Sequence, residues 1–318
     1  MLQYIVIQLD DTSTSFCHYP NQKNGRHLMP LETLRKGIVF GLKENLGIQI
    51  IYPSFKLPDE YERLIEDFDC VRIKPATASG SADVIVFNNL SNADGFEFKT
   101  DCDYVLRIDK ETLFNEYVSV AAILDKVRRL NIVITDIEAF SKSDFGQYEY
   151  VLGRLCEHIQ EAYAQGRMPQ CNVLTDRIVL DGMNNCGAGE TTVTLAPDGR
   201  FYVCPGFYLG DGLWSIGNID EGVDIRNPQL FRLDHAPICR NCDAFQCHRC
   251  IWLNKKTTLE VNTPSHEQCV VAHLERNESR KLQKALTEYT GLFSSNKEIE
   301  EISYLDPFEN RKQWKENQ

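Results

Sequence analysis

The sequence predicts an α/β protein in which a larger half of alternating strands and helices precedes a smaller cysteine-rich part. Two observations support this division. Short apolar runs alternate with helical patterns over the first 140 residues, and seven of the twelve cysteines fall between Cys186 and Cys269. A strand, a helix and a further strand form the βαβ unit of a parallel sheet or barrel. The first half is therefore expected to be a parallel sheet or a partial barrel.

Six apolar runs predict the strands of this sheet. Polar residues, proline or glycine bound each run, as they bound buried strands. The runs cover residues 4–9, 48–53, 70–75, 83–88, 104–109 and 131–137. Helical patterns cover residues 30–47, 110–131 and 146–166. Pro30 stands at the start of the first helix and Gly47 at its end, which are the places these residue types favour.

The pattern changes near residue 170. Alternating apolar and polar residues on both sides of a Pro-Asp-Gly turn predict a β-hairpin over residues 191–204. A loop-rich segment with the dense cysteines follows, then an amphipathic helix from about residue 270 and a charged stretch to Gln318 that is expected to fray. We therefore expect three segments, residues 1–170, 171–275 and 276–318.

Composition excludes several classes of partner. The chain of 318 residues has 34 Lys and Arg against 46 Asp and Glu, a formal net charge of −12, so no nucleic-acid partner is expected. The N-terminal apolar run is broken by Gln8 and Asp10 and lacks a basic region, and no run reaches the roughly 18 apolar residues of a membrane helix. Twelve cysteines without a secretory signal predict a cytoplasmic protein whose thiols bind metal or do redox chemistry.

The stretch "CRNCDAFQCHRC", residues 239–250, contains two CxxC pairs. This spacing puts both sulfurs of a pair on one side of a tight turn, ready to bind a metal centre. Structural zinc is the simplest occupant, although the four residues between the pairs leave little room for a zinc finger. Cys186, Gly199 and Cys204 precede the pairs and Cys269 follows them, so the seven cysteines form an ordered frame.

This frame resembles the SPASM domain, the auxiliary iron–sulfur domain of many peptide-modifying radical SAM enzymes. The resemblance covers residues 186–269, including "CGAG", "PDGRFYVCPGF" and "IGNIDEG". Two gaps between cysteines are shorter than the family's usual five and three residues. Four residues lie between Cys242 and Cys247, and two lie between Cys247 and Cys250. The resemblance implies two [4Fe-4S] clusters. One would be held by Cys239, Cys242, Cys247 and Cys269, and the other by Cys186, Cys204, Cys250 and a fourth ligand. That ligand stays open: Cys171 or Cys156 could supply it, or a substrate thiolate could occupy an open iron.

Six βα units before such a domain look like the partial six-stranded barrel of the radical SAM fold. That family carries CxxxCxxC after its first strand, and three thiolates there leave one iron open for S-adenosylmethionine. The corresponding positions here are Asp10, Thr14 and Cys17, and the glycine-rich turn expected after the second strand reads "IYPSFKLP". We therefore expect no independent cleavage of S-adenosylmethionine and interpret Cys17 as an unreactive buried residue. Iron ligation by Asp10 and Thr14 is the alternative, which the preference of soft clusters for sulfur disfavours.

A degenerate barrel beside an intact cysteine frame resembles the CXXX repeat peptide maturases. This resemblance implies a maturation protein for a ribosomally made, cysteine-rich precursor peptide. Its clusters would serve in electron transfer or thiolate capture, with a radical SAM enzyme as partner protein, and no catalytic residue is assigned. The alternative is a non-catalytic scaffold or interaction protein in which the thiols hold zinc together with His235, His248 or His266. If His248 does not bind zinc, it is expected to be a solvated loop residue.

Overall fold

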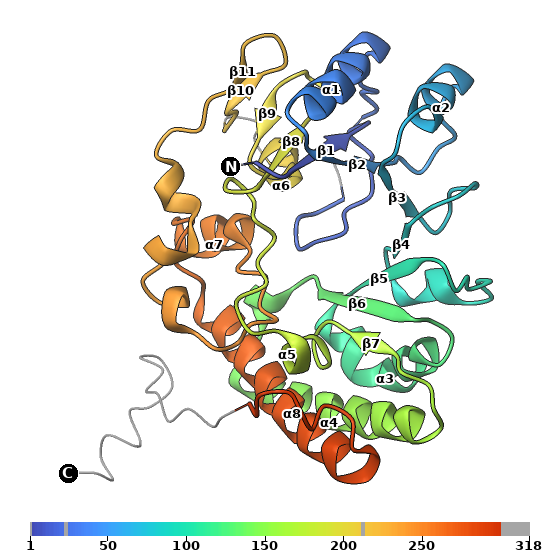
Figure 1. Ribbon diagram of the computed structural model, residues 1–318, viewed down its shortest axis with the longest axis vertical. Helices are drawn as coiled ribbons and strands as arrows, with labels where there is room; N and C mark the ends of the chain where they lie inside the picture. The colour runs from blue at the N-terminus through green and yellow to red at the C-terminus, as the bar shows by residue number, and fades with distance from the viewer. Residues whose placement is uncertain (1, 22–24, 211–213, 300–318) are drawn as a thin grey trace.

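The computed structural model describes residues 2–21, 25–210 and 214–299 of the chain. In this part, one curved sheet has the strand order β7-β6-β5-β4-β3-β2-β1-β8-β9 (Figure 1). Strands β1 to β6 are parallel and follow one another in chain order. Their bounds are β1 (Tyr4–Gln8), β2 (Gly47–Ile51), β3 (Val71–Pro75), β4 (Val84–Phe87), β5 (Asp103–Ile108) and β6 (Arg129–Ile134). The six parallel strands that the sequence predicted are present.

Each of the six central strands contributes one β-branched residue to a single buried layer. Successive side chains of a strand point to opposite faces of the sheet, so Ile5 and Ile7 face the helices while Val6 faces away from them. Phe16, from the loop after β1, packs against the same layer. The layer comprises Val6, Ile51, Ile73, Val86, Val105 and Val133. This layer is the inner face of the partial barrel.

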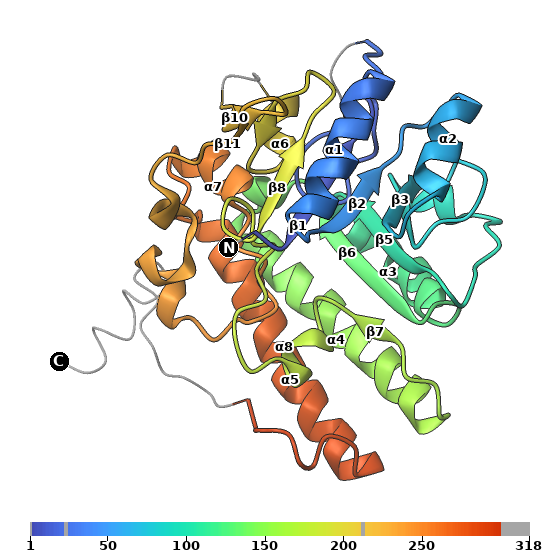
Figure 2. The same ribbon diagram turned by 45° about the horizontal axis from the view of Figure 1, so that its top comes forward.

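Helices cover the opposite face of the sheet (Figures 1 and 2). Helices α1 (Leu31–Lys43) and α2 (Asp59–Glu66) pack on β1, β2 and β8. Helices α3 (Lys110–Leu124) and α4 (Lys142–Ala164) pack on β4, β5 and β6, and α8 (His266–Thr290) lies along α4. The three helices predicted in the first half and the helix near residue 270 are all present, whereas α2 was not predicted.

Two helices begin earlier than the sequence patterns predicted. Helix α4 starts at Lys142 because Ser141 and Asp144 form a capping box, and α8 starts at His266 because Ser265 and Gln268 do the same. Helix α8 therefore crosses the expected boundary between residues 275 and 276. The end of the predicted tail, residues 300–318, lies outside the described residues.

The predicted hairpin is present but extends the main sheet. Strands β8 (Thr192–Leu195) and β9 (Phe201–Tyr202) pair antiparallel, as expected, and β8 also pairs parallel with β1. At the other edge, β7 (Gln170–Cys171) pairs with β6. The sheet thus spans the expected boundary near residue 170, and the three-segment division stays a prediction.

Short elements make up the rest of the cysteine-rich part. They are α5 (Asp176–Val179), α6 (Pro205–Leu209), β10 (Gly217–Asn218), β11 (Gly222–Val223) and α7 (Ile251–Thr258), with short 3-10 turns at Pro228–Phe231, Leu233–His235 and Cys239–Asn241. Similar turns in the first half are Leu90–Ala93 and Ile137–Ala139. In Figure 1 the orange segment with α7 lies across the molecule from α2. Of the helices in the described residues, none has the length and apolar character to cross a membrane.

Candidate metal centre

One group of cysteines surrounds Cys247. Cys239 opens a short 3-10 turn, Cys242 directly follows that turn, and Cys269 lies in the first turn of α8. Burial raises the pKa of the Cys247 thiol well above its usual value, and the neighbouring thiols of Cys239, Cys242 and Cys269 raise it further. The structure thus brings together the four cysteines that the SPASM resemblance assigns to one cluster. Their binding of iron stays a prediction.

Polar groups of the loop and of α8 contact the sulfur of Cys242. The backbone N–H of Ala244 donates to Cys242 Sγ at 3.4 Å, and His273 Nε2 lies 3.5 Å from the same sulfur. His273 follows Cys269 by four residues in α8, so both side chains lie on one face of the helix. The sequence reading missed His273, although this helical spacing from a predicted ligand was visible in the sequence.

A second group contains Cys186, Cys204 and Cys250. Cys204 directly precedes α6 and Cys250 directly precedes α7. Burial raises the pKa of Cys204, and the thiols of Cys250 and Cys186 raise it further. Burial, then the neighbouring Cys186 thiol, raises the pKa of Cys250 to about 12. The structure therefore also gathers the three cysteines that were expected to share the second cluster.

A close backbone contact joins two of these segments. Gly206 lies two residues after Cys204, and Trp252 lies two residues after Cys250. A Cβ atom added to Gly206 would stand 2.5 Å from Trp252 Cδ1, which is too close for any side chain. Glycine at this position therefore lets the turn after Cys204 pack directly on the indole ring.

The donor chemistry of both groups fits an iron–sulfur cluster. All seven side chains are soft sulfur donors, which suit iron–sulfur clusters and zinc. Burial raises the pKa values of five of them, so metal uptake must displace protons from these thiols; the five are Cys186, Cys204, Cys239, Cys247 and Cys250. Within residues 2–21, 25–210 and 214–299, no three His, Cys, Asp or Glu side chains are spaced to hold a single metal ion. A bound cluster would supply one-electron redox chemistry at these positions.

The two spare thiols considered as a fourth ligand lie in another part of the core. Cys171 is in β7, where burial raises its pKa to about 12 and its charged neighbours include Asp176, Arg129 and Glu275. The thiol of Cys156 points at the carbonyl oxygen of Glu278 at 3.7 Å, between α4 and α8. Neither thiol is therefore well placed to be a fourth ligand in the group that contains Cys204.

The loop after β1 does not provide the donors of a cluster that binds S-adenosylmethionine. Asp10 Oδ1 accepts hydrogen bonds from Thr12 N at 2.8 Å and from Thr12 Oγ1 at 2.6 Å. The hydroxyl of Thr14 donates to Asn88 Oδ1 at 3.3 Å. Asp10 Oδ1 and the Thr14 hydroxyl are engaged within the protein, whereas Asp10 Oδ2 is buried without a hydrogen-bond partner among the described residues. Two of the three positions carry hard oxygen groups, so the loop does not fit a three-thiolate site.

Cys17 differs from its expected environment. The sequence reading placed it as a buried core residue, but the side chain is only half-buried. The loop that carries it runs past α6, where Cys17 packs against a cluster that contains Tyr19 and Phe207. The expectation of full burial was wrong because Cys17 lies in the loop after β1, which ends at Gln8, and not inside the sheet.

The three histidines of the zinc alternative have separate surroundings. His235 Nδ1 pairs with Asp234 Oδ1 at 2.9 Å on the surface. The ring of His266 stands edge-on to Phe145, with centroids 6.0 Å apart. His248 is exposed, as expected for a loop residue, although desolvation by nearby protein atoms lowers its pKa. Only His248 of the three stands between the cysteines of the CxxC pairs.

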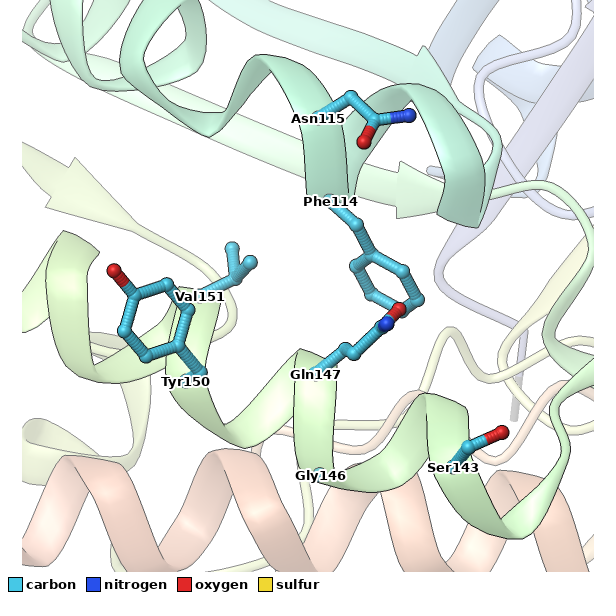
Figure 3. Close-up of a pocket in the computed structure, with 7 residues that line it drawn as sticks. All are labelled: Phe114, Asn115, Ser143, Gly146, Gln147, Tyr150 and Val151. Carbon is cyan, nitrogen blue, oxygen red and sulfur yellow. The ribbon is translucent and has the colours of Figure 1, made fainter.

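A pocket of about 460 Å³ lies between α3 and α4, on the helical side of the sheet (Figure 3). The side chains of Phe114 and Gln147 face one another across it (Figure 3). Its lining is completed by Asn115, Ser143, Gly146, Tyr150 and Val151. The lining contains no cysteine and no charged side chain, so none of the candidate metal ligands lines this pocket.

Comparison with known proteins identifies the fold. No protein-family model and no curated protein matches the sequence. The structure of native anSMEcpe with bound AdoMet and Cp18Cys peptide is similar, with a TM-score of 0.64 and 12% identity over 92% of this chain and 100% of that chain. The same protein with AdoMet and Kp18Cys peptide gives a TM-score of 0.63 and 12% identity over 91% and 99%.

A third structure, SuiB of Streptococcus suis bound to precursor peptide SuiA, aligns less well. Its TM-score is 0.43, with 13% identity over 76% of this chain and 66% of that chain. The expected fold is thus confirmed through the anSMEcpe structures, which are similar to nearly the whole of this chain. This chain has the radical SAM-like fold of anSMEcpe, with a cysteine-rich C-terminal part.

Proposed function

We propose that this chain is an iron–sulfur protein that binds a ribosomally made, cysteine-rich precursor peptide and takes part in its maturation. One observation carries the proposal: the seven cysteines of the frame gather into two groups in the folded chain. The structural likeness to anSMEcpe, which has been solved with peptide bound, supports a peptide as the partner.

Each group of thiols has a distinct role in this proposal. Cys239, Cys242, Cys247 and Cys269 hold one [4Fe-4S] cluster, and Cys186, Cys204 and Cys250 supply three ligands to the second. Four thiolates complete the coordination of the first cluster, which suits it to electron transfer. The second cluster either transfers electrons or captures a thiolate of the peptide at an iron that lacks a protein ligand.

The radical chemistry comes from a partner in this proposal. Because Asp10 and Thr14 replace two of the three thiols of a radical SAM motif, the chain does not cleave S-adenosylmethionine on its own. A separate radical SAM enzyme provides that step, and this chain contributes peptide binding and its clusters.

Two measurements on the anaerobically purified full chain test the proposal. The first counts iron and sulfide per chain, for which we expect about eight of each. The second titrates a synthetic peptide that carries cysteine at every fourth position, with serine in place of cysteine in the control peptide. We expect the cysteine peptide to bind at least about tenfold more tightly, a difference of about 1.4 kcal/mol.

The outcomes separate the alternatives. Absence of peptide binding, with and without a radical SAM partner, would eliminate the maturation role. A colourless protein that contains zinc and no iron would eliminate the clusters and leave the scaffold alternative.

A further inference from the structure

The loop that carries Cys17 is bonded to the helix that follows Cys204. The hydroxyl of Tyr208, in α6, donates a hydrogen bond to Asp11 Oδ1, in the loop after β1. Both groups are buried, and they lie 197 positions apart in the sequence. The contact fixes the position of the barrel loop relative to the segment that contains Cys204.

The four segments that carry Cys17, Cys186, Cys204 and Cys250 meet in one hydrophobic cluster. Cys17 and Cys204 both pack against it. Its buried members include Ala188, two residues after Cys186, and Ile251, directly after Cys250. The barrel loop therefore reaches the same place as the three segments of the second cysteine group.

The thiol of Cys17 has the thiols of the second group as neighbours. Burial raises its pKa well above the usual value, and the thiols of Cys186, Cys250 and Cys204 raise it further. In the proposed ligand assignment these are the only three cysteines of the second cluster. A fourth sulfur donor thus stands beside a group of three.

Hydrogen bonds hold the backbone on both sides of Cys17. Arg107, a buried residue of β5, donates from Nε to the carbonyl oxygen of Cys17 at 3.2 Å and from Nη2 to that of Tyr19 at 3.0 Å. Between them, the His18 ring nitrogen Nδ1 lies 3.0 Å from the carbonyl oxygen of Ile134, at the end of β6. The loop is therefore anchored across the barrel, which preorganises its thiol.

We propose that Cys17 is the fourth protein ligand of the cluster held by Cys186, Cys204 and Cys250. Four thiolates complete the coordination of the four irons, so this cluster has no open iron for a peptide thiol. The inference rests on the proposed function and decides between its two roles, since a closed cluster serves electron transfer. It also replaces the interpretation of Cys17 as an unreactive residue.

The test compares cysteine variants of the full chain after anaerobic reconstitution with iron and sulfide. Cys17→Ala should hold about four fewer iron atoms than the wild type, or should show the electron paramagnetic resonance signal of a three-iron cluster after mild oxidation. Cys186→Ala is the positive control for the same cluster. Cys70→Ala is the matched control, because Cys70 is also half-buried but lies beside Arg72 and Asp83.

A double variant tests whether the two residues share one cluster. The double variant Cys17→Ala/Cys186→Ala should lose no more iron than the single variant Cys186→Ala. Cys17→Ala with the iron content and resonance signals of the wild type overturns the inference, while the proposed function stands. A wild-type protein with zinc and no iron overturns the proposed function, and the zinc content of Cys17→Ala then shows whether Cys17 is a ligand.

Alkylation of the wild-type protein covers the case in which a variant does not fold. Cysteine labelling is measured by mass spectrometry in the metal-free and the reconstituted protein. We expect Cys17 to lose reactivity on reconstitution together with Cys204, while Cys70 keeps it. If reconstitution leaves the labelling of Cys17 unchanged, Cys17 is not a ligand.

Discussion

At the scale of single residues, the two cysteine groups should respond separately to substitution. Cys247 has three thiol neighbours in one group, and Cys204 has two in the other. Replacing either residue with alanine removes one ligand from one group, so each variant should lose about half of the iron. Iron and sulfide analysis checks this, with Cys70→Ala as the unaffected control. Equal and complete loss of iron in both variants would contradict two independent clusters.

Glu275 is a buried carboxyl group that should make stability depend on pH. It is 8% exposed, and the hydroxyl of Tyr148 donates to its Oε1 at 2.7 Å. Burial raises its pKa to about 7, so the folded protein keeps a proton that the unfolded chain releases near pH 4.3. The stabilisation by this proton is complete below about pH 4 and is lost as the pH rises through 7, by about 4 kcal/mol in total.

The variant Glu275→Gln removes this titration while keeping a similar shape. Urea unfolding at pH 5 and pH 8 should show that the wild type loses about 3 kcal/mol more than the variant over this interval. Parallel loss in the two proteins would show that Glu275 is ionised in the folded state at both pH values.

At the scale of elements, the capping box at the start of α8 should hold the helical turn that carries Cys269. Ser265 Oγ accepts a hydrogen bond from Gln268 N at 3.3 Å, and Ser265 N donates to Gln268 Oε1 at 3.0 Å. Cys269 lies directly after this capping box. Ser265→Ala should lower the free energy of unfolding by about 1 kcal/mol.

The readouts for this variant are thermal unfolding and iron retention on dilution. We expect iron to dissociate faster, because the turn that carries Cys269 is less well held. Ser294→Ala, at an exposed serine beyond the end of α8, is the control. A variant that matches this control in both measurements would show that the cap does not position Cys269.

At the scale of the whole molecule, Asp243 connects the cysteine loop to two helices. Arg276 Nε, in α8, lies 2.7 Å from Asp243 Oδ2, and these side chains are 6% and 10% exposed. Arg177, in α5, donates from Nε to the carbonyl oxygen of Asp243 at 2.7 Å. Asp243→Ala removes a buried carboxylate partner of the Arg276 guanidinium, which should cost about 3 kcal/mol of stability.

Anaerobic denaturant unfolding measures this cost. Asp234→Ala is the control, because Asp234 pairs with Arg232 on the surface and exposed pairs contribute little. Equal stability of the two variants would mean that the ion pair of Asp243 and Arg276 does not hold the loop in place.

The sequence by itself determined the local elements and the chemistry of the candidate metal ligands. The strands from Tyr4 to Ile134 follow from apolar runs bounded by polar residues, because the period of a strand is a local property. The frame from Cys186 to Cys269 follows from spacing alone. Helix α2 was missed because its short pattern between Asp59 and Glu66 has only two buried residues, Tyr61 and Ile65.

Only the tertiary structure decided which distant segments meet. It placed β8 on the free edge of β1, and it brought Cys17 to Cys186, Cys204 and Cys250. Edge pairing and contacts between segments more than 160 residues apart depend on the burial of the whole chain, which local periodicity does not encode. The spacing of Cys17 was therefore interpreted as the remnant of a lost motif, whereas its folded position gives it three thiol neighbours.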